Sequence, residues 1–421
     1  MRKIFLLILS FIVIITLMGC EKSDSESSLL LFSHNRIALQ KDWYWGYYNK
    51  DGKMVIDCQY EKADSFYNGV AIVVKDNQYY IIDTNGKEVI KEGYDYLYFD
   101  KETGLIWYYE HNKMGLMNVK GKKITEPIFD RGFAQFSEGL AAVAVDCKYG
   151  YINKKGDFVI NPEYISADDF SYGYASVKKD NKYGFINKNN ELIINYDYDY
   201  PGRFTKEGLV ITGNNYKKTV LNNLGEVLVT NLNDCSVSSE FILGKTDSNY
   251  YLYDLDGNQI EDFLIPNTFH NEIELLGSLI VVIDYSDSIA VGKIINSKME
   301  TLYEVTANSL IDYFVHDNLI HFIYQKDNNI KIVNEFQEYT ANVDANYLNY
   351  YNGLIVIRKD FEHGVIDHKG NIILERIYDL IYIYDDGIVV KLNNRFGIFG
   401  YNGDQILPIE FEGYRGLYIN S

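Results

Sequence analysis

The chain has 421 residues, a formal net charge of −19, 47% hydrophobic residues and 24% charged residues. This is a globular composition with enough length for a large core, and its acidity argues against nucleic acid or anionic membrane headgroups as partners. The 39 Tyr against only 5 Pro favour strands over helices, because the tyrosine ring suits a pleated, half-buried surface.

Residues 1–19 have the order of a secretory signal peptide: a short positive start, then a continuous apolar run. "LMGC" (Leu17 to Cys20) follows and resembles the bacterial lipobox, with Met18 as a departure. The resemblance implies cleavage before Cys20 and lipidation of that residue, and an uncleaved anchor helix is the alternative. In either case we expect the body of the chain on the extracytoplasmic face of the cell membrane, held there by its N-terminus.

Residues 20–33 are expected to form a tether, because "EKSDSESS" (Glu21 to Ser28) offers no apolar side chain to bury. Three further cysteines, Cys58, Cys147 and Cys235, have no spacing typical of a zinc site. We expect them to be buried free thiols, with a disulfide between two of them as the alternative.

A repeat follows. Equivalent turn positions recur every 32 to 35 residues except for one gap, at Gly52, Gly86, Gly121, Gly156, Asn190, Gly225, Gly257, Gly370 and Gly403. The gap between Gly257 and Gly370 has room for two decayed copies, around Gly292 to Met299 and His321 to Val333. The sequence therefore predicts about eleven units of roughly 34 residues, two of them degenerate.

Each recurring position has a structural purpose. An Asn or Asp three residues before the anchor starts a turn by accepting backbone N–H groups, at Asn49, Asp83, Asn118, Asn153, Asn187, Asn222, Asp254 and Asp367. The Gly, or Asn190, then takes the left-handed conformation that closes a β-hairpin. Apolar strands flank the turn, an aromatic residue follows eight positions later, and an F-x-x-G step leads into another strand. One unit is thus expected to hold about three antiparallel strands, which must stack on neighbouring units to bury both faces.

These segments resemble the bacterial WG (KWG) repeat, over about residues 35–231 and 350–415. "KYGYINKKGDFVINPEY" (Lys148 to Tyr164) shows the aromatic-Gly pair, the N-x-x-G hairpin and the later aromatic residue. Only Trp45-Gly46 is a true WG pair, since other aromatic residues or His363 fill the Trp position elsewhere. The resemblance implies a β-repeat protein and carries no catalytic residues over.

The sequence divides into regular repeats over 34–257, degenerate repeats over 258–349 and C-terminal repeats over 350–421. We predict an all-β, propeller-like stack of antiparallel sheets, with an open curved superhelix as the alternative. "NRIAL" (Asn35 to Leu39) and "GLYIN" (Gly416 to Asn420) look like copies of the same strand at the two ends. On that reading no blade needs completion by the opposite terminus.

Motifs for catalysis, cofactors or metals are absent from the sequence, and none of these is predicted. "DLDGN" (Asp254 to Asn258) coincides with a hairpin turn of its repeat, which is favoured over a calcium loop. His316 and His321 are expected on opposite faces of one strand, a poor start for a metal site. The acidic pairs Asp168-Asp169, Asp197 with Asp199, and Asp385-Asp386 are interpreted as solvated turns.

Aromatic clusters supply the predicted ligand surface, because tyrosine and tryptophan offer rigid amphipathic area for sugars or peptides. Its residues are Trp107, Tyr108, Tyr109, Tyr198, Tyr200 and Tyr382. The leading interpretation is a non-enzymatic, lipid-anchored binding or scaffold module for protein or glycan, with function sought where copies diverge, over 258–349. The alternatives are a secreted glycan-active enzyme that uses paired carboxylates and an accessory module for a neighbouring secreted or membrane protein.

Overall fold

The structure is a computed structural model that describes residues 28–130, 134–268, 271–285, 289–309 and 311–419. The predicted signal peptide, Cys20 and most of the predicted tether lie outside these residues. All regular elements of the described ranges are β-strands, which confirms the all-β prediction. The described part of the chain has no helix of the length and apolar character needed to span a membrane.

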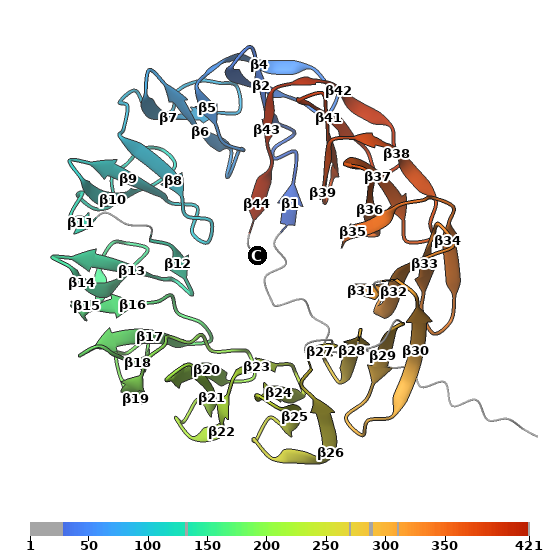
Figure 1. Cartoon of the computed structure of the whole chain (residues 1–421). Helices are drawn as coiled ribbons and strands as arrows, with labels where there is room; N and C mark the ends of the chain where they lie inside the picture. Colours follow the sequence, from blue (N-terminus) through green and yellow to red (C-terminus); the bar gives the residue numbers. More distant parts are fainter. Residues whose placement is uncertain (1–27, 131–133, 269–270, 286–288, 310, 420–421) are drawn as a thin grey trace, which may run out of the picture.

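Eleven small antiparallel sheets, called blades 1 to 11, stand around a closed ring in the described residues (Figure 1). Blade 1 comprises β43 (Gly413–Arg415), β2 (Ile37–Lys41), β3 (Tyr44–Tyr48) and β4 (Met54–Tyr60), and blade 2 comprises β5 (Lys62–Ala63), β6 (Val70–Lys75) and β7 (Gln78–Asp83). Blade 3 comprises β8 (Tyr96–Phe99), β9 (Ile106–Glu110), β10 (Lys113–Met117) and β11 (Phe129–Asp130). Blade 4 comprises β12 (Phe136–Ser137), β13 (Leu140–Val145), β14 (Lys148–Asn153) and β15 (Phe158–Tyr164).

Blades 5 to 8 contain the middle of the chain, including one of the two degenerate copies. Blade 5 comprises β16 (Ser166–Ala167), β17 (Tyr174–Lys179), β18 (Lys182–Asn187) and β19 (Leu192–Tyr198), and blade 6 comprises β20 (Leu209–Asn214), β21 (Lys217–Asn222) and β22 (Val227–Leu232). Blade 7 comprises β23 (Asp234–Val237), β24 (Phe241–Lys245), β25 (Asn249–Asp254) and β26 (Gln259–Pro266). Blade 8 comprises β27 (Asn271–Leu276), β28 (Leu279–Asp284), β29 (Ala290–Ile295) and β30 (Thr301–Ala307).

Blades 9 to 11 complete the ring. Blade 9 comprises β31 (Ile311–His316), β32 (Leu319–Lys326), β33 (Asn329–Val333) and β34 (Glu338–Ala341). Blade 10 comprises β35 (Asn346–Tyr351), β36 (Leu354–Lys359), β37 (Glu362–Asp367) and β38 (Ile372–Tyr378). Blade 11 comprises β39 (Leu380–Tyr384), β40 (Gly387–Leu392), β41 (Arg395–Phe399) and β42 (Gln405–Phe411). The predicted number of units is confirmed, and blades 8 and 9 are the two decayed copies. Most blades have four strands, not three, because the segment after the recurring aromatic residue adds a short inner strand.

The turns form as the sequence predicts. The Asn153 side-chain oxygen accepts the backbone N–H groups of Lys155 and Asp157, at 2.9 and 3.1 Å, and Gly156 follows with a φ of 83°. The same pair of bonds forms at each of the other seven predicted Asn and Asp positions. Asn296 forms it too, in degenerate blade 8.

The core lies between the blades, as expected for sheets that cannot bury both faces alone. One cluster joins blades 4 and 5 through Tyr151, Ile160, Phe170 and Val177. Hydrogen bonds supplement this packing, since the Ser137 hydroxyl donates to the Phe170 carbonyl of the next blade at 2.6 Å. Equivalent serine bonds start from Ser33 and Ser171.

The two chain ends close the ring, so the expectation that no blade needs the opposite terminus was wrong. β43 pairs antiparallel with β2 and is the inner strand of blade 1, whose other strands are N-terminal. "GLYIN" does not repeat a blade strand, because β44 (Leu417–Ile419) within it pairs with β1 (Ser28–Leu30). The Asp386 carboxylate also accepts the backbone N–H groups of Leu31 and Phe32, at 2.6 and 3.1 Å. A closed ring replaces the alternative of an open superhelix.

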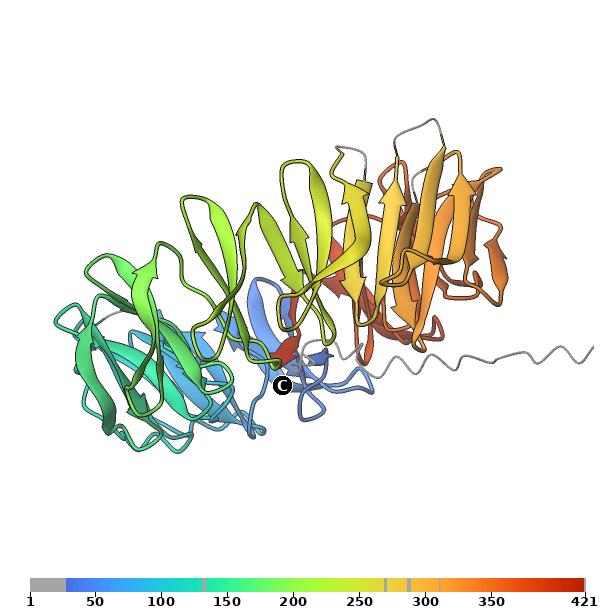
Figure 2. The same cartoon turned by 90° about the horizontal axis from the view of Figure 1, so that it is seen from below.

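The ring has two faces, since strands alternate in direction within each blade (Figure 2). The "hairpin face" carries the tips between second and third strands, together with the links between blades. The "turn face" carries the N-x-x-G turns and the turns after the inner strands. Because β43 is antiparallel to β2, which ends at a hairpin-face tip, β43 leads the chain toward the turn face.

Candidate binding face

Two-residue tips line the hairpin face in nine blades of the described chain. Both residues of each tip have positive φ, between 47° and 70°, as hairpins with type I′ turns require. The tips are Asp42-Trp43, Asp76-Asn77, His111-Asn112, Asp146-Cys147, Asp180-Asn181, Asn215-Tyr216, Asp327-Asn328, Asp360-Phe361 and Asn393-Asn394. The backbone is therefore the same from tip to tip, while the side chains differ.

Three tips place an aromatic residue where five others place asparagine. Trp43, Tyr216 and Phe361 are 79%, 89% and 88% exposed, at φ of 68°, 63° and 70°. Asparagine tolerates this left-handed conformation better than a bulky side chain does. These aromatic rings thus combine backbone strain with almost no burial to compensate for it.

Acidic residues on the links hold several tips in place. Glu412 accepts the Trp43 backbone N–H at 2.8 Å and pairs with Arg395 at 2.9 Å. At the tip of blade 4, the Cys147 N–H donates to Asp130 at the end of β11 in blade 3, at 2.7 Å, and Asp130 pairs with Lys113 at 2.6 Å. The bond from Lys113, then the bond from the Cys147 backbone, lower the pKa of Asp130.

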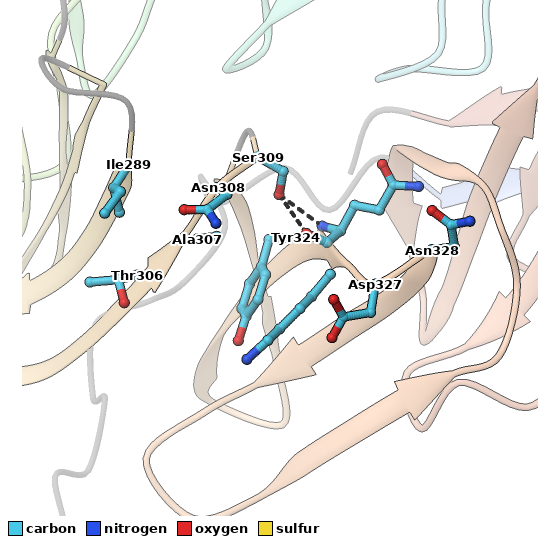
Figure 3. A pocket seen from close by; sticks show the side chains of 10 residues that line it. Ile289, Thr306, Ala307, Asn308, Ser309, Tyr324, Asp327 and Asn328 are labelled. Atoms are coloured by element: carbon cyan, nitrogen blue, oxygen red, sulfur yellow. Dashed lines mark hydrogen bonds between the residues drawn. The ribbon is translucent and has the colours of Figure 1, made fainter.

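Two pockets open on the hairpin face at equivalent places, each between a link and the tip of the same blade. The larger, of about 470 Å³, lies where blade 8 joins blade 9 and is lined by Ile289, Thr306, Ala307, Asn308, Ser309, Tyr324, Gln325, Lys326, Asp327 and Asn328 (Figure 3). The smaller, of about 300 Å³ in blade 3, is lined by Glu92, Gly93, Tyr94, Asp95, Tyr109, Glu110, His111 and Asn112. The larger one falls in the degenerate region, where the sequence directs the search for function.

In blade 9 the link contacts the strand below the tip. The Ser309 hydroxyl accepts the Gln325 N–H at 3.1 Å and donates to the Gln325 carbonyl at 2.7 Å. Asp327 and Asn328 at the tip are exposed. This leaves the tip carboxylate and amide, with the half-buried Tyr324 ring, as a polar lining able to hydrogen-bond a ligand.

Half of the predicted aromatic ligand surface is buried. Trp107 and Tyr108 have no exposed area and Tyr109 has 6%, because β9 is inserted between the cores of neighbouring blades. These three residues are packing groups and not part of an exposed surface. Tyr198 is half-buried against the core between blades 5 and 6.

Tyr200 and Tyr382 remain accessible. Tyr200 lies beside the tip aromatic residue Tyr216, with ring centroids 6.4 Å apart, and its hydroxyl oxygen accepts the Tyr216 backbone N–H at 3.2 Å. Tyr382 is 46% exposed on the inner strand β39, away from the tips. The structure thus brings Tyr200, but not Tyr382, to the strained aromatic tips.

One or both residues of each acidic pair make structural contacts. Ser176 donates to Asp168, and Arg203 lies 3.6 Å from Asp169, whose burial raises its pKa. Asp199 pairs with Lys182 at 2.7 Å. Asp385 accepts the Tyr351 hydroxyl at 2.7 Å, next to Asp386 at the ring closure.

The histidines are arranged differently from the prediction. His316 and His321 lie on adjacent strands, because a turn at Asp317-Asn318 separates them, and their ring centroids are 6.2 Å apart. His368 of blade 10 comes within 4.2 Å of His316 by the same measure. No group of three or more His, Cys, Asp or Glu side chains among the described residues has an arrangement able to hold a metal ion.

The three cysteines covered by the structure are free thiols. Cys58 and Cys235 are half-buried, whereas Cys147 is exposed at the tip of blade 4. The prediction of free thiols is confirmed, and the prediction of burial was wrong for Cys147. That residue occupies the tip position of Trp43, Tyr216 and Phe361.

The tip aromatic residues were missed at the sequence level, although a signal exists. Between the second and third strands the repeat usually has asparagine, as in "KDNQYY" and "KDNKYG". "KDWYWG" and "KDFEHG" have an aromatic residue in the same place. The departure lies in a loop that the turn-based alignment treats as a connector.

Comparison with known proteins agrees with the repeat. Residues 45–79, 81–113, 114–148, 149–183, 183–217 and 364–395 match the family model described as "WG containing repeat". No curated protein sequence matches the chain.

Solved structures that resemble the chain include a eukaryotic initiation factor, with 14% identity, 74% of this chain and 97% of that chain covered, and a TM-score of 0.36. Hsv2 of Kluyveromyces lactis has 10% identity, coverage of 60% and 96%, and a TM-score of 0.33. AztD from Citrobacter koseri has 11% identity, coverage of 66% and 95%, and a TM-score of 0.30.

Proposed function

Because this chain is a WG repeat protein whose eleven blades close into a ring, we propose that it is a binding or scaffold module that engages its ligand through the hairpin face. The module is non-enzymatic, its ligand is a protein or a glycan, and lipid on Cys20 holds it at the extracytoplasmic face of the cell membrane. The observation that carries the proposal is the set of aromatic residues at strained, exposed tips.

Stability does not account for these side chains. A residue held in a sparsely populated backbone region costs about 1–3 kcal/mol and persists only where something compensates. Trp43, Tyr216 and Phe361 bury too little surface to supply that compensation. Exposed aromatic residues are typical of binding sites, where a ligand buries the ring and recovers the energy.

The positions of the pockets and of the chain ends also support the hairpin face as the binding face. Both described pockets lie among hairpin-face tips and links. The chain ends approach from the turn-face side, because β43 runs away from the tips toward β44, which pairs with β1. Ser28, where β1 begins, is eight residues after Cys20. A short tether of this kind would present the hairpin face away from the anchoring membrane.

The contacts of the carboxylates support a non-enzymatic role. A glycosidase needs two carboxyl groups that flank the scissile bond, one of them held protonated. Asp168, Asp199 and Asp386 instead take part in contacts that fix strands, links or the ring closure. A net charge of −19 also disfavours nucleic acid as the ligand.

The test of the binding face compares two triple variants of the full chain in proximity labelling from intact cells that produce it. Trp43→Asn/Tyr216→Asn/Phe361→Asn installs the asparagine that other tips already have. Val159→Asn/Val227→Asn/Ile372→Asn changes equally apolar side chains on outer strands that are 49%, 55% and 47% exposed. We expect the tip variant to lose the labelled neighbours and the outer-strand variant to retain them. Equal labelling by the tip variant and the unmodified chain would refute the proposed face.

The anchor has its own test. Cells grown with a palmitate analogue should incorporate the label into the unmodified chain and not into Cys20→Ser. Absence of label in the unmodified chain contradicts the proposed lipidation, whatever the outcome at the hairpin face.

A further inference from the structure

We propose that the ligand of the hairpin face is a basic polypeptide surface, whose lysine and arginine side chains contact the tip aspartates and the tip aromatic rings. This inference rests on the proposed function above and specifies its partner class. It is carried by the distribution of charge on the face and by the distance between the aromatic tips.

Carboxylates dominate the tips. Six of the nine tips begin with an aspartate that is exposed and has no ion pair in the described part of the chain: Asp42, Asp76, Asp146, Asp180, Asp327 and Asp360. Because each stands at the end of a hairpin, these groups form an acidic ring on one face of a chain that is itself acidic. Such a field attracts cationic partners and raises their association rate.

The chain does not neutralise this ring itself. Cations at the strand ends below the tips pair with acids of the links, of the outer strands that lead into them, or of the blade 7 tip: Lys41 with Glu410, Lys113 with Asp130, Lys182 with Asp199, Lys217 with Asp247, Lys359 with Asp344 and Arg395 with Glu412. Lys75, Lys148 and Lys326 stand beside tips without an ion pair among the described residues. Six tip carboxylates outnumber these three ammonium groups, so the tips carry an excess of negative charge.

The aromatic rings fit the same partner. In Asp42-Trp43 and Asp360-Phe361 a carboxylate adjoins an exposed aromatic ring. A lysine or arginine side chain can pair with the carboxylate while its cation lies over the ring face, a contact worth about 0.5–2 kcal/mol. The chain uses this contact internally, since the Lys218 ammonium lies 6.0 Å from the centroid of Tyr200, the neighbour of Tyr216.

The placement of the aromatic tips indicates an extended partner. Trp43 belongs to blade 1 and Phe361 to blade 10, whereas Tyr216 belongs to blade 6, across the ring from blade 1 (Figure 1). A short glycan fills one such site, but a partner that buries all three rings has to span the ring. A protein surface has that size and supplies the charge that a neutral glycan lacks.

The test measures binding of the full chain to immobilised poly-L-lysine, with a neutral glucan as the second probe. Asp42→Asn/Asp76→Asn/Asp180→Asn/Asp360→Asn removes four tip charges. Asp51→Asn/Asp157→Asn/Asp256→Asn/Asp404→Asn removes four charges from exposed aspartates of the turn face, and so matches the change in net charge. We expect the tip variant to bind at least about tenfold more weakly, and the turn-face variant to stay within about twofold. The affinity of the unmodified chain should fall steeply between about 50 and about 200 mM salt.

Two results would overturn the inference. Equal weakening by both charge variants would mean that poly-L-lysine senses only net charge. Tip-dependent binding of the glucan, without binding of poly-L-lysine, would make the ligand a glycan. In the second case the hairpin face still binds a ligand, so the proposed function stands. The proposed function itself is refuted if the aromatic tip variant keeps its labelled neighbours in the proximity-labelling experiment. The aromatic tip variant leaves the net charge unchanged, and about tenfold weaker poly-L-lysine binding is expected of it too.

Discussion

The two faces of the ring use the repeat in opposite ways. On the turn face, the same Asn or Asp side chain makes the same two backbone bonds in blade after blade, including the degenerate blade 8. On the hairpin face, the backbone of the nine two-residue tips is constant while the second residue is Trp, Asn, Cys, Tyr or Phe. Uniform chemistry on one face indicates a requirement for stability, and variable chemistry on a uniform backbone indicates a surface free to specialise.

The comparison predicts that the largest stability losses come from the turn-face side, at the ring closure. Asp386→Ala leaves the N–H groups of Leu31 and Phe32 without their acceptor and removes the Lys50 pair. We expect a loss of about 2–4 kcal/mol in the free energy of unfolding, measured by denaturant titration. Asp256→Ala, an exposed turn-face change, serves as the control and should leave stability within about 0.5 kcal/mol.

A single turn should have a smaller effect. Asn153→Ala removes the acceptor of two backbone N–H groups in an exposed turn, so we expect a loss of about 1 kcal/mol by thermal or denaturant unfolding. Lys155→Ala in the same turn keeps both bonds and should be neutral. A neutral Asn153→Ala would mean that the strands alone fix this hairpin and that the turn chemistry is dispensable.

The histidines near the turn face predict a pH effect. Burial first, and then charge on His368, lower the pKa of His316 below its ordinary value near 6.5, and burial lowers the pKa of His321. Folding thus opposes protonation, so their contribution to stability is complete above about pH 6.5 and is lost as the pH falls through the lower pKa of the folded state. Asp317 offsets part of this shift at His316.

The melting temperature should therefore fall between pH 7 and pH 5. His316→Gln/His321→Gln should flatten this slope. An unchanged slope would assign the pH dependence to other groups.

The smallest expected stability change is a gain, on the hairpin face. Tyr216→Asn replaces a strained, 89% exposed ring with the residue found at five other tips, so we expect about 0.5–1 kcal/mol of added stability. Differential scanning calorimetry measures the effect, and Asn181→Gln at another tip is a control that should lose stability. A loss of stability in Tyr216→Asn would contradict the difference inferred between the two faces.

The periodicity of the sequence predicted the fold well because repeat positions encode local interactions. The Asn and Asp turns, the anchor glycines and the two decayed copies in the gap all follow from neighbours within a few residues. Ring closure did not, since β43 and β2 are separated by almost the whole chain, and so are β1 and β44.

The candidate site was predicted in part. Tyr200 was selected and lies at the hairpin face, whereas Trp107, Tyr108 and Tyr109 were selected for composition and are buried. An aromatic-rich strand has the same sequence pattern whether it is inserted between two blades or faces solvent. Its burial is therefore decided by the neighbouring sheets. Trp43, Tyr216 and Phe361 were missed because positive φ and exposure are properties of the folded hairpin.

Closure through strands from the two ends also sets an order of events for folding. Blade 1 lacks its inner strand until Gly413–Arg415 has been synthesised, although its other three strands are made long before. We expect the blades with purely local pairing to form first, and the joint between the termini to form last, because it closes the longest loop. Until then the edge of β2 offers unpaired backbone groups to any other strand, so the interval before closure is when two copies of this chain are most prone to exchange strands.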